Sequence, residues 1–486
     1  MFERARPTSC DSPRTAKPKT DAPQPVADSP AQSSFAEPPP PAGPADRTAA
    51  DVRRWRGPAP YRQGGPALRP WIVWGTGLLS YLVAVLDRTT FGVSGLDAAE
   101  RFHAGPGMLS SFVTLQLIVY GAMQIPAGVL LDRFGPRIMI TAGVVILSAA
   151  QATLALTQSL TTAISAYGVI GLGDSFIFIS VIRLLPTWFA PQRVPLLTQL
   201  TGIVGQFGQF LSAVPFLAIL LHDGWTAAYL SAAGMGGFAA ALTLAIARDA
   251  PSPKAATSAS RPQSFRAAIH EIAAVWSRPG TKLGFFTHVG NASSPGVFAL
   301  MWGVPYLTSA QGLSRHMAGA ALTLSVAPFI VLGLLVGTLS SRRPEHRPTM
   351  ALAMIVLTAL MWTVVLALPQ PAPHWLLAVL ILVISGGQPV SMLAFDFARS
   401  YNPPAAMGTA QGMVNTGGFL AMLLIMQAMG VVIAANGGYS FAAFRLAWSV
   451  QYVVWAISIA GVMIYTRKAK HSEALGEAPL PLRTTE

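Results

Sequence analysis

Long apolar stretches alternate with short polar ones over most of this chain of 486 residues. Each apolar stretch is long enough for a helix to cross a hydrocarbon core about 30 Å thick. The alternating ten-residue pattern of membrane strands is absent, which excludes a β-barrel. The pattern predicts an all-α polytopic membrane protein with twelve transmembrane helices, near residues 71–93, 108–130, 138–157, 161–184, 196–221, 225–247, 283–307, 317–339, 350–368, 375–398, 407–433 and 442–465.

Polar segments flank and divide these helices. Residues 1–70 are rich in proline and cannot bury enough apolar surface to fold alone, so we expect a disordered cytoplasmic tail. Four further parts are predicted: a six-helix bundle over 71–247, a cytoplasmic linker over 248–280, a second six-helix bundle over 281–466 and a cytoplasmic tail over 467–486. In the linker, the spacing of Phe265, Ile269, Ile272 and Trp276 predicts a short amphipathic helix.

Composition supports the membrane assignment, because 52% of the residues are hydrophobic and only 11% are charged. Soluble domains have roughly 25% charged residues. The net charge of +13 suggests nucleic acid as a partner, but the positions of the charges exclude it. Of the 33 lysines and arginines, 29 fall on the side that holds both termini. The exceptions are Arg88 within a span and Arg101, Arg315 and Arg445 on the other face. The positive-inside rule therefore predicts an inner-membrane protein with both termini in the cytoplasm.

Residues typical of cofactor or metal chemistry are missing. Cys10 is the only cysteine, which excludes an internal disulfide, and no His or Cys cluster has the spacing of metal ligands. The chain has no Walker loop, so ATP does not drive it directly. We expect no enzymatic activity, no cofactor and no metal, and a monomer that binds the lipid bilayer, a small-molecule substrate and protons.

The segment between the second and third predicted helices carries a distinctive motif. It resembles the loop G-x-L-x-D-R-x-G-x-[RK] of the major facilitator superfamily, at Gly128, Leu130, Asp132, Arg133, Gly135 and Arg137. The resemblance implies two six-helix bundles and transport by alternating access; an ordinary positive-inside loop is the alternative. We expect Asp132 to lie against the amino end of helix eleven, near residues 404–407, and to hold the cytoplasmic side shut.

A degraded second copy of this loop follows the eighth predicted helix. Residues 337–343 repeat the motif at an offset of 209, and Gly337, Leu339 and Arg342 match Gly128, Leu130 and Arg133. Asp132 is replaced by Ser341. The repeat indicates duplicated halves.

Charged residues within the predicted spans are the main functional candidates. A charged residue at the centre of a spanning helix raises the free energy of membrane insertion by roughly 2.5–3.5 kcal/mol. We therefore expect a functional or structural role for each of the four such residues, Asp87, Arg88, Asp174 and Asp396. Arg183 and Arg399 are nearer the cytoplasmic ends, and we expect them to reach the membrane surface. Asp396 is one turn from Arg399, which is compatible with a structural ion pair or with a role in transport.

Three segments of the first half also resemble the anion:cation symporter branch of the superfamily. Residues 86–90 (LDRTT) are similar to its Y-x-D-R-x-N element, residues 120–128 to the end of its helix two, and residues 188–193 to its W-F-P-x-x-x-R. Residues 408–415 echo its G-x-x-x-G-x-x-N. That branch carries organic acids with protons or sodium. Helix four of that branch has an arginine at the position of Tyr167, two turns from the position of Asp174. This chain lacks that second cation, and its loss argues against a doubly charged substrate.

We therefore expect Asp87 or Asp174 to carry the coupling proton, and Arg88 either to hold one of these carboxylates ionised or to bind a substrate carboxylate. Tyr167 belongs to the same candidate site for coupling and substrate. The alternative is that Asp87 and Arg88 neutralise each other as a structural pair. Further polar or aromatic residues in the spans are candidates for the cavity wall or, equally, for bonds between helices. They are Gln116, Tyr120, Gln206, Gln209, His288, Asn291, Trp302, Gln388, Gln411 and Asn415.

The sequence thus favours a secondary transporter that imports a small organic solute with protons, with an organic acid among the candidate substrates. A proton-driven exporter of drugs or metabolites is the first alternative, although the G-x-x-x-G-P pattern of such exporters is absent from helix five. A membrane receptor or enzyme on this scaffold is the second alternative.

Overall fold

The computed structural model describes residues 68–104, 106–251 and 265–474. The predicted disordered tail lies outside these residues, except for its last three positions, and Cys10 lies outside them too. Most of the predicted linker before residue 265 and the C-terminal tail after residue 474 are also outside. The described residues are almost entirely helical and contain no β-strand.

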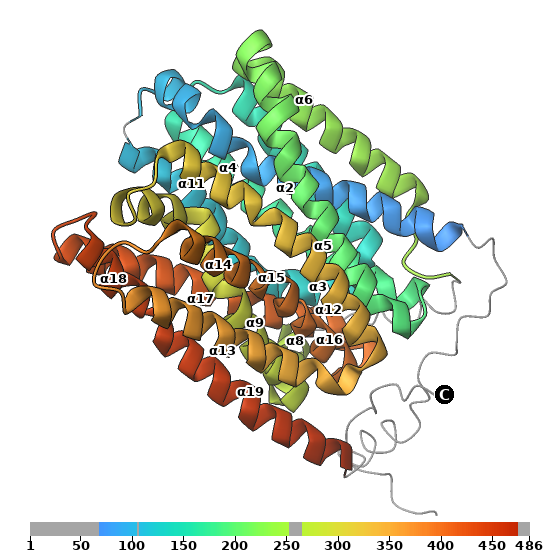
Figure 1. Ribbon diagram of the computed structural model, residues 1–486. Coiled ribbons are helices and arrows are strands. Elements are labelled where there is room, and N and C mark those ends of the chain that lie inside the picture. The colour runs from blue at the N-terminus through green and yellow to red at the C-terminus, as the bar shows by residue number, and fades with distance from the viewer. Residues whose placement is uncertain (1–67, 105, 252–264, 475–486) are drawn as a thin grey trace, which may run out of the picture. The chain divides into compact units, whose positions relative to one another are not determined.

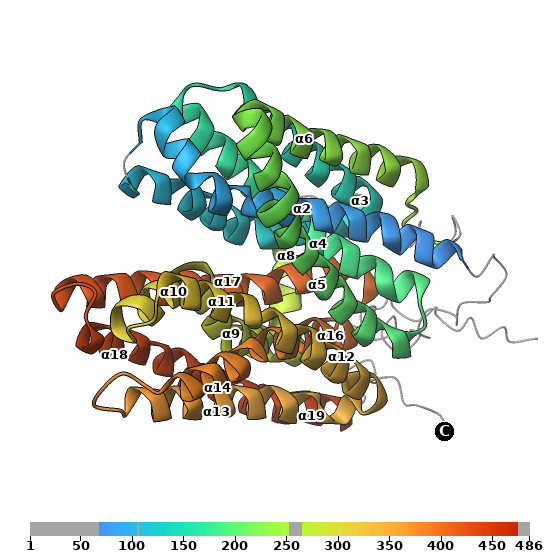
Figure 2. The same cartoon turned by 45° about the horizontal axis from the view of Figure 1, so that its top comes forward.

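The first bundle consists of five helical elements that follow one another along the chain with short connections (Figure 1 and Figure 2). Their bounds are α2 (Arg69–Phe102), α3 (Pro106–Leu156), α4 (Leu160–Trp188), α5 (Val194–Leu211) and α6 (Leu217–Ile246). A short π-helical segment, Ser212–Phe216, connects α5 to α6. Apolar positions cover all sides of α4, which is buried along most of its length in the middle of this bundle.

The amphipathic helix α8 (Phe265–Ser277) leads into the second bundle. That bundle contains more interruptions than the first. Its elements are α9 (Pro279–Val297), α10 (Gly303–Pro305), α11 (Arg315–Leu324), α12 (Val326–Arg342), α13 (Arg347–Leu366), α14 (His374–Ser385), α15 (Gly387–Ser391), α16 (Leu393–Tyr401), α17 (Met407–Ala435), α18 (Phe441–Ser449) and α19 (Gln451–Ala474).

Nine helical segments in the described part of the chain are long and apolar enough to cross a membrane. Two of these segments each contain two predicted helices, because the helical backbone continues from one predicted helix into the next across a bend. The bends lie at Gly135 in α3 and at Gly224 in α6. Both glycines have φ near +80°, which residues with a Cβ atom rarely adopt. The predicted seventh helix, α9 and its continuation to Ala310, is not among the nine. Polar residues and two π-helical segments, Phe298–Trp302 and Tyr306–Ala310, interrupt its apolar pattern.

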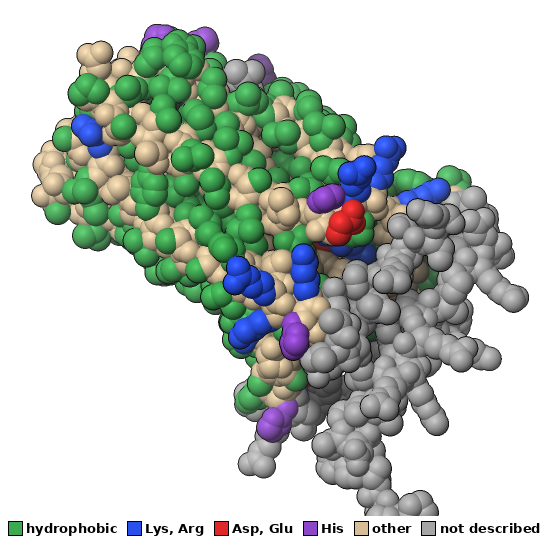
Figure 3. Space-filling model, turned by 60° about the horizontal axis from the view of Figure 1, so that its bottom comes forward, with side chains coloured by type: hydrophobic (Ala, Val, Ile, Leu, Met, Phe, Trp, Pro, Cys, Tyr) green, Lys and Arg blue, Asp and Glu red, His purple; other side chains and the backbone are tan. Residues whose placement is uncertain are grey.

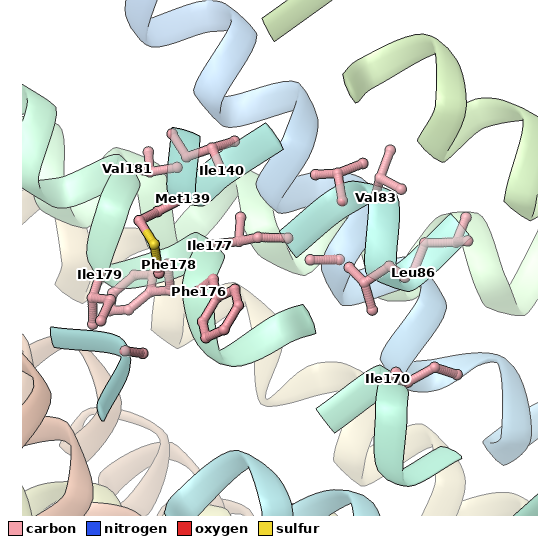
Figure 4. Close-up of a cluster of buried hydrophobic side chains, with 14 of the residues drawn as sticks. Val83, Leu86, Met139, Ile140, Ile170, Phe176, Ile177, Phe178, Ile179 and Val181 are labelled. Atoms are coloured by element: carbon pink, nitrogen blue, oxygen red, sulfur yellow. The ribbon is translucent and has the colours of Figure 1, made fainter. Parts of the chain in front are cut away.

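The two bundles share part of one hydrophobic core. The largest cluster of buried apolar side chains lies in the first bundle and includes Val83, Ile140, Ile177 and Val181 (Figure 4). Seven residues of the second bundle, between Ala394 and Val414, belong to the same cluster. The rest of the second bundle has two clusters of its own. The shared side chains therefore join the bundles around α4, the end of α16 and the start of α17.

One end of the helices, where α2 begins and α19 finishes, is here called the basic end. Figure 3 shows Lys and Arg side chains gathered there, next to a predominantly hydrophobic surface. At the opposite end, Arg101 donates to the carbonyl oxygens of Ala155 and Thr157, and Arg445 donates to that of Leu366. These arginines satisfy the last carbonyl groups of α3 and α13, which have no partner within their own helices.

Candidate functional site

An ion pair within the first bundle joins α2 to α4. Arg88 Nη1 lies 3.0 Å from Asp174 Oδ2 and donates a hydrogen bond to it. The two side chains differ in exposure, because 24% of the Arg88 side chain is accessible and only 1% of the Asp174 side chain is. Asp174 therefore bonds to the guanidinium group from a buried position, while part of the Arg88 side chain is accessible.

Asp87 precedes Arg88 in the chain but does not pair with it. Adjacent residues on a helix point in directions about 100° apart. Asp87 is fully buried, and neither of its carboxylate oxygens has a hydrogen-bond partner. The Gln151 amide donates instead to the main-chain oxygen of Asp87 at 3.2 Å. The alternative interpretation of Asp87 and Arg88 as a mutually neutralised pair is therefore wrong, since Arg88 pairs with Asp174.

Tyr167 lies two turns before Asp174 on α4 and is fully buried. Its hydroxyl group is 2.9 Å from that of Thr90, one helical turn beyond Asp87 on α2. Its ring packs edge-on against Phe91 and Phe112. Tyr167 thus joins α4 to α2 through one hydrogen bond and aromatic packing.

A chain of polar side chains crosses from the first bundle to the second near the middle of α3 and α17. Asn415 Nδ2 donates to Gln124 Oε1 at 2.7 Å and to the Tyr120 hydroxyl oxygen at 3.3 Å. The Tyr120 ring also packs against Phe419 of α17, with 4.5 Å between ring centroids. Tyr120 and Asn415 were both predicted from the sequence, whereas Gln124 was not singled out.

The other predicted cavity residues also contact neighbouring groups, and His288 lies next to Asn415 of this polar chain. His288 Nδ1 is 3.4 Å from the main-chain oxygen of Ser391, and Asn291 donates to the main-chain oxygens of Thr287 and Ala351. Gln388 accepts a long hydrogen bond from Ser391. Gln116 and Gln411 are buried, and each has one side-chain atom without a partner.

At the basic end, the Asp132 carboxylate bridges the two bundles. Its Oδ1 accepts a hydrogen bond from the Gly408 N–H, and its Oδ2 accepts one from the Thr409 N–H, both at 2.7 Å. The Thr409 hydroxyl group donates to Oδ2 at 2.9 Å. These N–H groups belong to the first turn of α17, where the helix has no partners for them and its dipole favours an anion.

The helices meet backbone to backbone beside Asp132. A Cβ atom at Gly128 would lie 2.4 Å from the Gly408 carbonyl oxygen, and one at Gly412 would lie 2.2 Å from the carbonyl oxygen of Gln124. Such distances do not occur between a real Cβ atom and an oxygen, so these positions require glycine. We call the contact between residues 124–132 and 408–415 the glycine seam.

Arg183 also crosses between the bundles at the basic end. Its Nη2 donates to the carbonyl oxygen of Pro404 at 2.7 Å. Pro404 lies just before α17, close to the groups that Asp132 binds. The expectation that Arg183 reaches the membrane surface is therefore wrong, because its guanidinium group bonds to the other bundle.

The rest of the first-half motif organises the loop itself. Gly135 makes the turn, and the Arg137 N–H donates to Asp249 Oδ1 at 2.7 Å. Arg137 also bonds through its side chain to the carbonyl oxygen of Leu244 at the end of α6. Burial raises the pKa of Asp249, although the Arg137 N–H partly offsets this by stabilising the carboxylate. Arg133 lies over the Phe134 ring, 5.2 Å from its centroid.

In the second half, the acidic residue of the corresponding region is Asp396 on α16. Asp396 Oδ1 accepts a hydrogen bond from Arg399 at 2.7 Å, and Oδ2 accepts one from Ser340 at 3.1 Å. Arg347 lies 3.8 Å from Oδ2 and donates to the Ser340 hydroxyl group at 2.8 Å. All four residues belong to the second bundle. Asp396 and Arg399 thus form the ion pair that their spacing predicts, and Arg399 does not reach the membrane surface as expected, because it bonds to this buried carboxylate.

Metal ligands do not gather in the described part of the chain, where no three His, Cys, Asp or Glu residues form a group that could hold an ion. The groups described above offer acid–base and electrostatic chemistry. These groups are the partly exposed side chain of Arg88, the buried carboxyl groups of Asp87 and Asp174, and the hydrogen bonds of Asp132 between the two bundles.

Known proteins with similar sequences are transporters. A family model described as the Major Facilitator Superfamily matches residues 77–426. A probable sulfoacetate transporter of Cupriavidus necator is 23% identical over 76% of this chain and 88% of its own length. A probable L-galactonate transporter of Escherichia coli is 25% identical over 34% of this chain and 37% of its own length. The human monocarboxylate transporter 7 is 26% identical over 28% of this chain and 26% of its own length.

Solved structures show the same fold. The proton:xylose symporter XylE superposes on 82% of this chain with a TM-score of 0.59 and 14% identity, and the match covers 96% of that chain. A bacterial homologue of the human lysosomal transporter Spinster, in an inward-facing and unoccupied conformation, superposes on 86% of this chain with a TM-score of 0.55 and 15% identity, and the match covers all of that chain.

Proposed function

This chain belongs to the Major Facilitator Superfamily, and we propose that it imports a small, singly charged organic acid together with protons. The protein is a multi-pass membrane transporter. Within that class, the observation that carries the proposal is the Arg88–Asp174 pair, in which the Arg88 side chain is partly accessible and the Asp174 side chain is buried. A substrate carboxylate that approaches this site meets the planar fork of donors of a guanidinium group.

The paired geometry explains how substrate and proton would be linked. Asp174 neutralises Arg88 while the site is empty, so a substrate carboxylate competes with Asp174 for the same donors. A buried carboxylate that loses its cationic partner raises the free energy of the protein, and protonation of the carboxylate removes this penalty. Asp87 lies on the same helix, fully buried and without a partner, and is a second place for the proton.

The charge of the site favours a substrate with one negative charge. Tyr167 occupies the position where the symporter branch has a second cation, and its hydroxyl group bonds to Thr90. Arg88 is then the only cation from the predicted set at this site. Sulfoacetate, L-galactonate and monocarboxylates, after which three of the similar transporters are named, are all organic acids. We expect L-galactonate or a simple monocarboxylate to be carried in preference to the doubly charged sulfoacetate.

We further propose that the monomer lies in an inner membrane with both termini in the cytoplasm. The gathering of basic side chains at the basic end supports this orientation. Single cysteines at Ser277 and Ser309, in a Cys10→Ser background, test it with an impermeant thiol reagent on intact cells. Labelling of position 309 and protection of position 277 are expected, and the reverse would invert the topology.

Uptake into proteoliposomes under an imposed proton gradient tests the function. We expect the wild type to accumulate a singly charged organic acid against its gradient. Asp87→Asn or Asp174→Asn should abolish accumulation but keep exchange across the membrane, because exchange returns the loaded carrier and does not require proton release. Asp223→Asn, which removes an exposed acid, is the matched control and should accumulate normally.

Three other results would each redirect the assignment. Extrusion driven by the proton gradient would establish an exporter. Absence of transport across a broad panel of organic acids and drugs would support a receptor or an enzyme. Full accumulation by both Asp87→Asn and Asp174→Asn would show that neither acid couples transport to protons.

A further inference from the structure

A groove at the basic end lies between the start of α9 and the end of α19. Its volume is about 490 Å³, and Pro279, Arg467, Lys468, His471 and Ser472 line it. Arg467, Lys468 and His471 are all exposed. Three basic side chains from little more than one turn of a helix therefore face one hollow in the surface.

An aromatic layer lies beside this groove. The Lys282 ammonium group is 5.6 Å from the centroid of the Trp276 ring and 5.4 Å from that of Tyr465. The Lys468 ammonium group is 5.5 Å from the Tyr465 centroid. Tyr465 in turn stacks on Phe286 of α9 with an interplanar angle of 6°. Amphipathic aromatic rings of this kind collect at the level of lipid headgroups.

Within the part of the chain whose side chains the structure describes, no acidic side chain balances the charge of the groove, because none forms an ion pair with Arg467, Lys468 or His471. Just before them on α19, Met463 and Ile464 are about half exposed. An exposed apolar surface on a spanning helix faces acyl chains, so the groove begins where the lipid-facing surface ends.

We propose that this groove binds the headgroup of an anionic phospholipid, with the phosphate held by Arg467 and Lys468. The acyl chains would continue along the apolar surface of α19 past Met463 and Ile464. Basic pockets between helices at the cytoplasmic face are suited to such headgroups, and Lys282 and Lys468 are held near the site by the aromatic rings. A free phosphate shares the headgroup chemistry but gains nothing from the apolar surface, so we assign the groove to the lipid.

Native mass spectrometry of the full chain in detergent, titrated with dioleoylphosphatidylglycerol, tests the proposal. The wild type should retain one lipid that Arg467→Gln/Lys468→Gln loses, with binding about tenfold weaker or more in the variant. The matched control is Arg342→Gln/Arg343→Gln, which removes two exposed arginines elsewhere at the basic end and should bind as the wild type does. Dioleoylphosphatidylcholine, which has no net charge, should bind all three proteins equally weakly.

Several outcomes would overturn the proposal. Equal retention of phosphatidylglycerol by the wild type and the Arg467/Lys468 variant would show that the groove does not bind it. An equal loss in the control would indicate attraction to the whole basic surface. Displacement of the lipid by millimolar glycerol phosphate would assign the groove to a soluble phosphate. Thermal unfolding without lipid, expected to be unchanged in both variants, shows that a loss of binding is not a loss of folding.

Discussion

The two copies of the interhelical loop form different hydrogen bonds in the two bundles. In the first copy, Asp132 bonds to Gly408 and Thr409 of the other bundle. In the second copy, Ser341 takes its place and donates to the Gly337 carbonyl oxygen one turn earlier on its own helix. The Asp132 side chain therefore bonds across the two bundles, whereas the Ser341 side chain bonds within its own helix. Gly337 of the same motif nevertheless packs against Leu196 and Gln199 of α5 in the first bundle. On the proposed alternating-access mechanism, the Asp132 contact opens during transport.

The acidic residues near the two copies also differ in their hydrogen-bond partners. The second half keeps a carboxylate in the region, but it lies on α16 as Asp396 and bonds to Ser340 and Arg399 of the same bundle. A change in Asp396 would strain one bundle, while a change in Asp132 would alter the balance between two transporter conformations. Paired substitutions in the two halves can separate these effects.

The largest difference is expected from alanine at the two motif glycines. A Cβ atom at Gly128 would meet the backbone oxygen of Gly408 at 2.4 Å, which cannot move without separating the helices. At Gly337 it would meet Gln199 Cγ and Leu196 Cα at 3.0 Å, where a side chain and a small shift can adjust. Gly128→Ala should slow uptake about 100-fold, consistent with about 3 kcal/mol of overpacking, and Gly337→Ala about threefold or less. Initial rates in proteoliposomes measure both, and equal rates would remove the distinction.

Substitution of the acidic position should have the next largest effect. Asp132→Asn keeps the shape but replaces one accepting oxygen with an NH₂ group that cannot accept from the α17 amides. Uptake should fall about 10- to 30-fold, since a hydrogen bond to a charged group contributes roughly 1.5–3 kcal/mol. Cysteine labelling at the basic end should increase in the same variant. Ser341→Ala is the matched change and should leave uptake within about twofold; a comparable loss there would mean that both loops act as gates.

The terminal arginines of α4 and α16 provide a third pair. Arg183 bonds across the bundles to Pro404, whereas Arg399 bonds within its own bundle to Asp396. Arg183→Gln should slow uptake about fivefold with little change in thermal unfolding. Arg399→Gln should do the opposite and lower the melting temperature by a few degrees, because it leaves a buried carboxylate short of a partner. Melting curves and uptake rates of the same preparations test whether Arg183→Gln affects mainly uptake and Arg399→Gln mainly stability.

The smallest effect is expected at Asp249, which supports the first loop from the end of α6. Burial raises the pKa of this carboxyl group above its usual value of about 3.9. The folded protein then binds the proton more tightly than the unfolded chain, so this contribution to stability falls as pH rises from about 4 through the raised pKa. Asp249→Asn should be less stable than the wild type only at the acidic end of that window. Melting temperatures between pH 4 and pH 8 measure it, and a difference that grows with pH would have the wrong sign.

Much of this arrangement follows from the sequence, because its causes are local. Apolar runs give the helices, and Gly135 gives the turn between two of them. The sequence also placed Asp132 against the start of helix eleven, through the preference of an anion for a helix amino end. The predicted helices are present in the described residues, and membership of the superfamily confirms the fold.

Other features depend on contacts between distant segments. Asp87 and Arg88 are neighbours in the sequence, yet the partner of Arg88 is 86 residues away. Arg347 was not singled out, because the ninth helix was predicted to begin near residue 350, three residues after α13 begins. The π-helical segments after α9 have no hydrophobic pattern of their own, so periodicity could not reveal them. Packing decides each of these features, and a single sequence does not show packing.

The glycine seam also has an electrical consequence. Helices that touch backbone to backbone at Gly128 and Gly408 leave no space between them for a file of water molecules. When the opposite side is open to its solution, the membrane potential therefore falls mainly across this thin layer of protein. An elementary charge that leaked through 100 mV would dissipate about 2.3 kcal/mol. On the proposed mechanism, the seam is then an insulator as well as a gate.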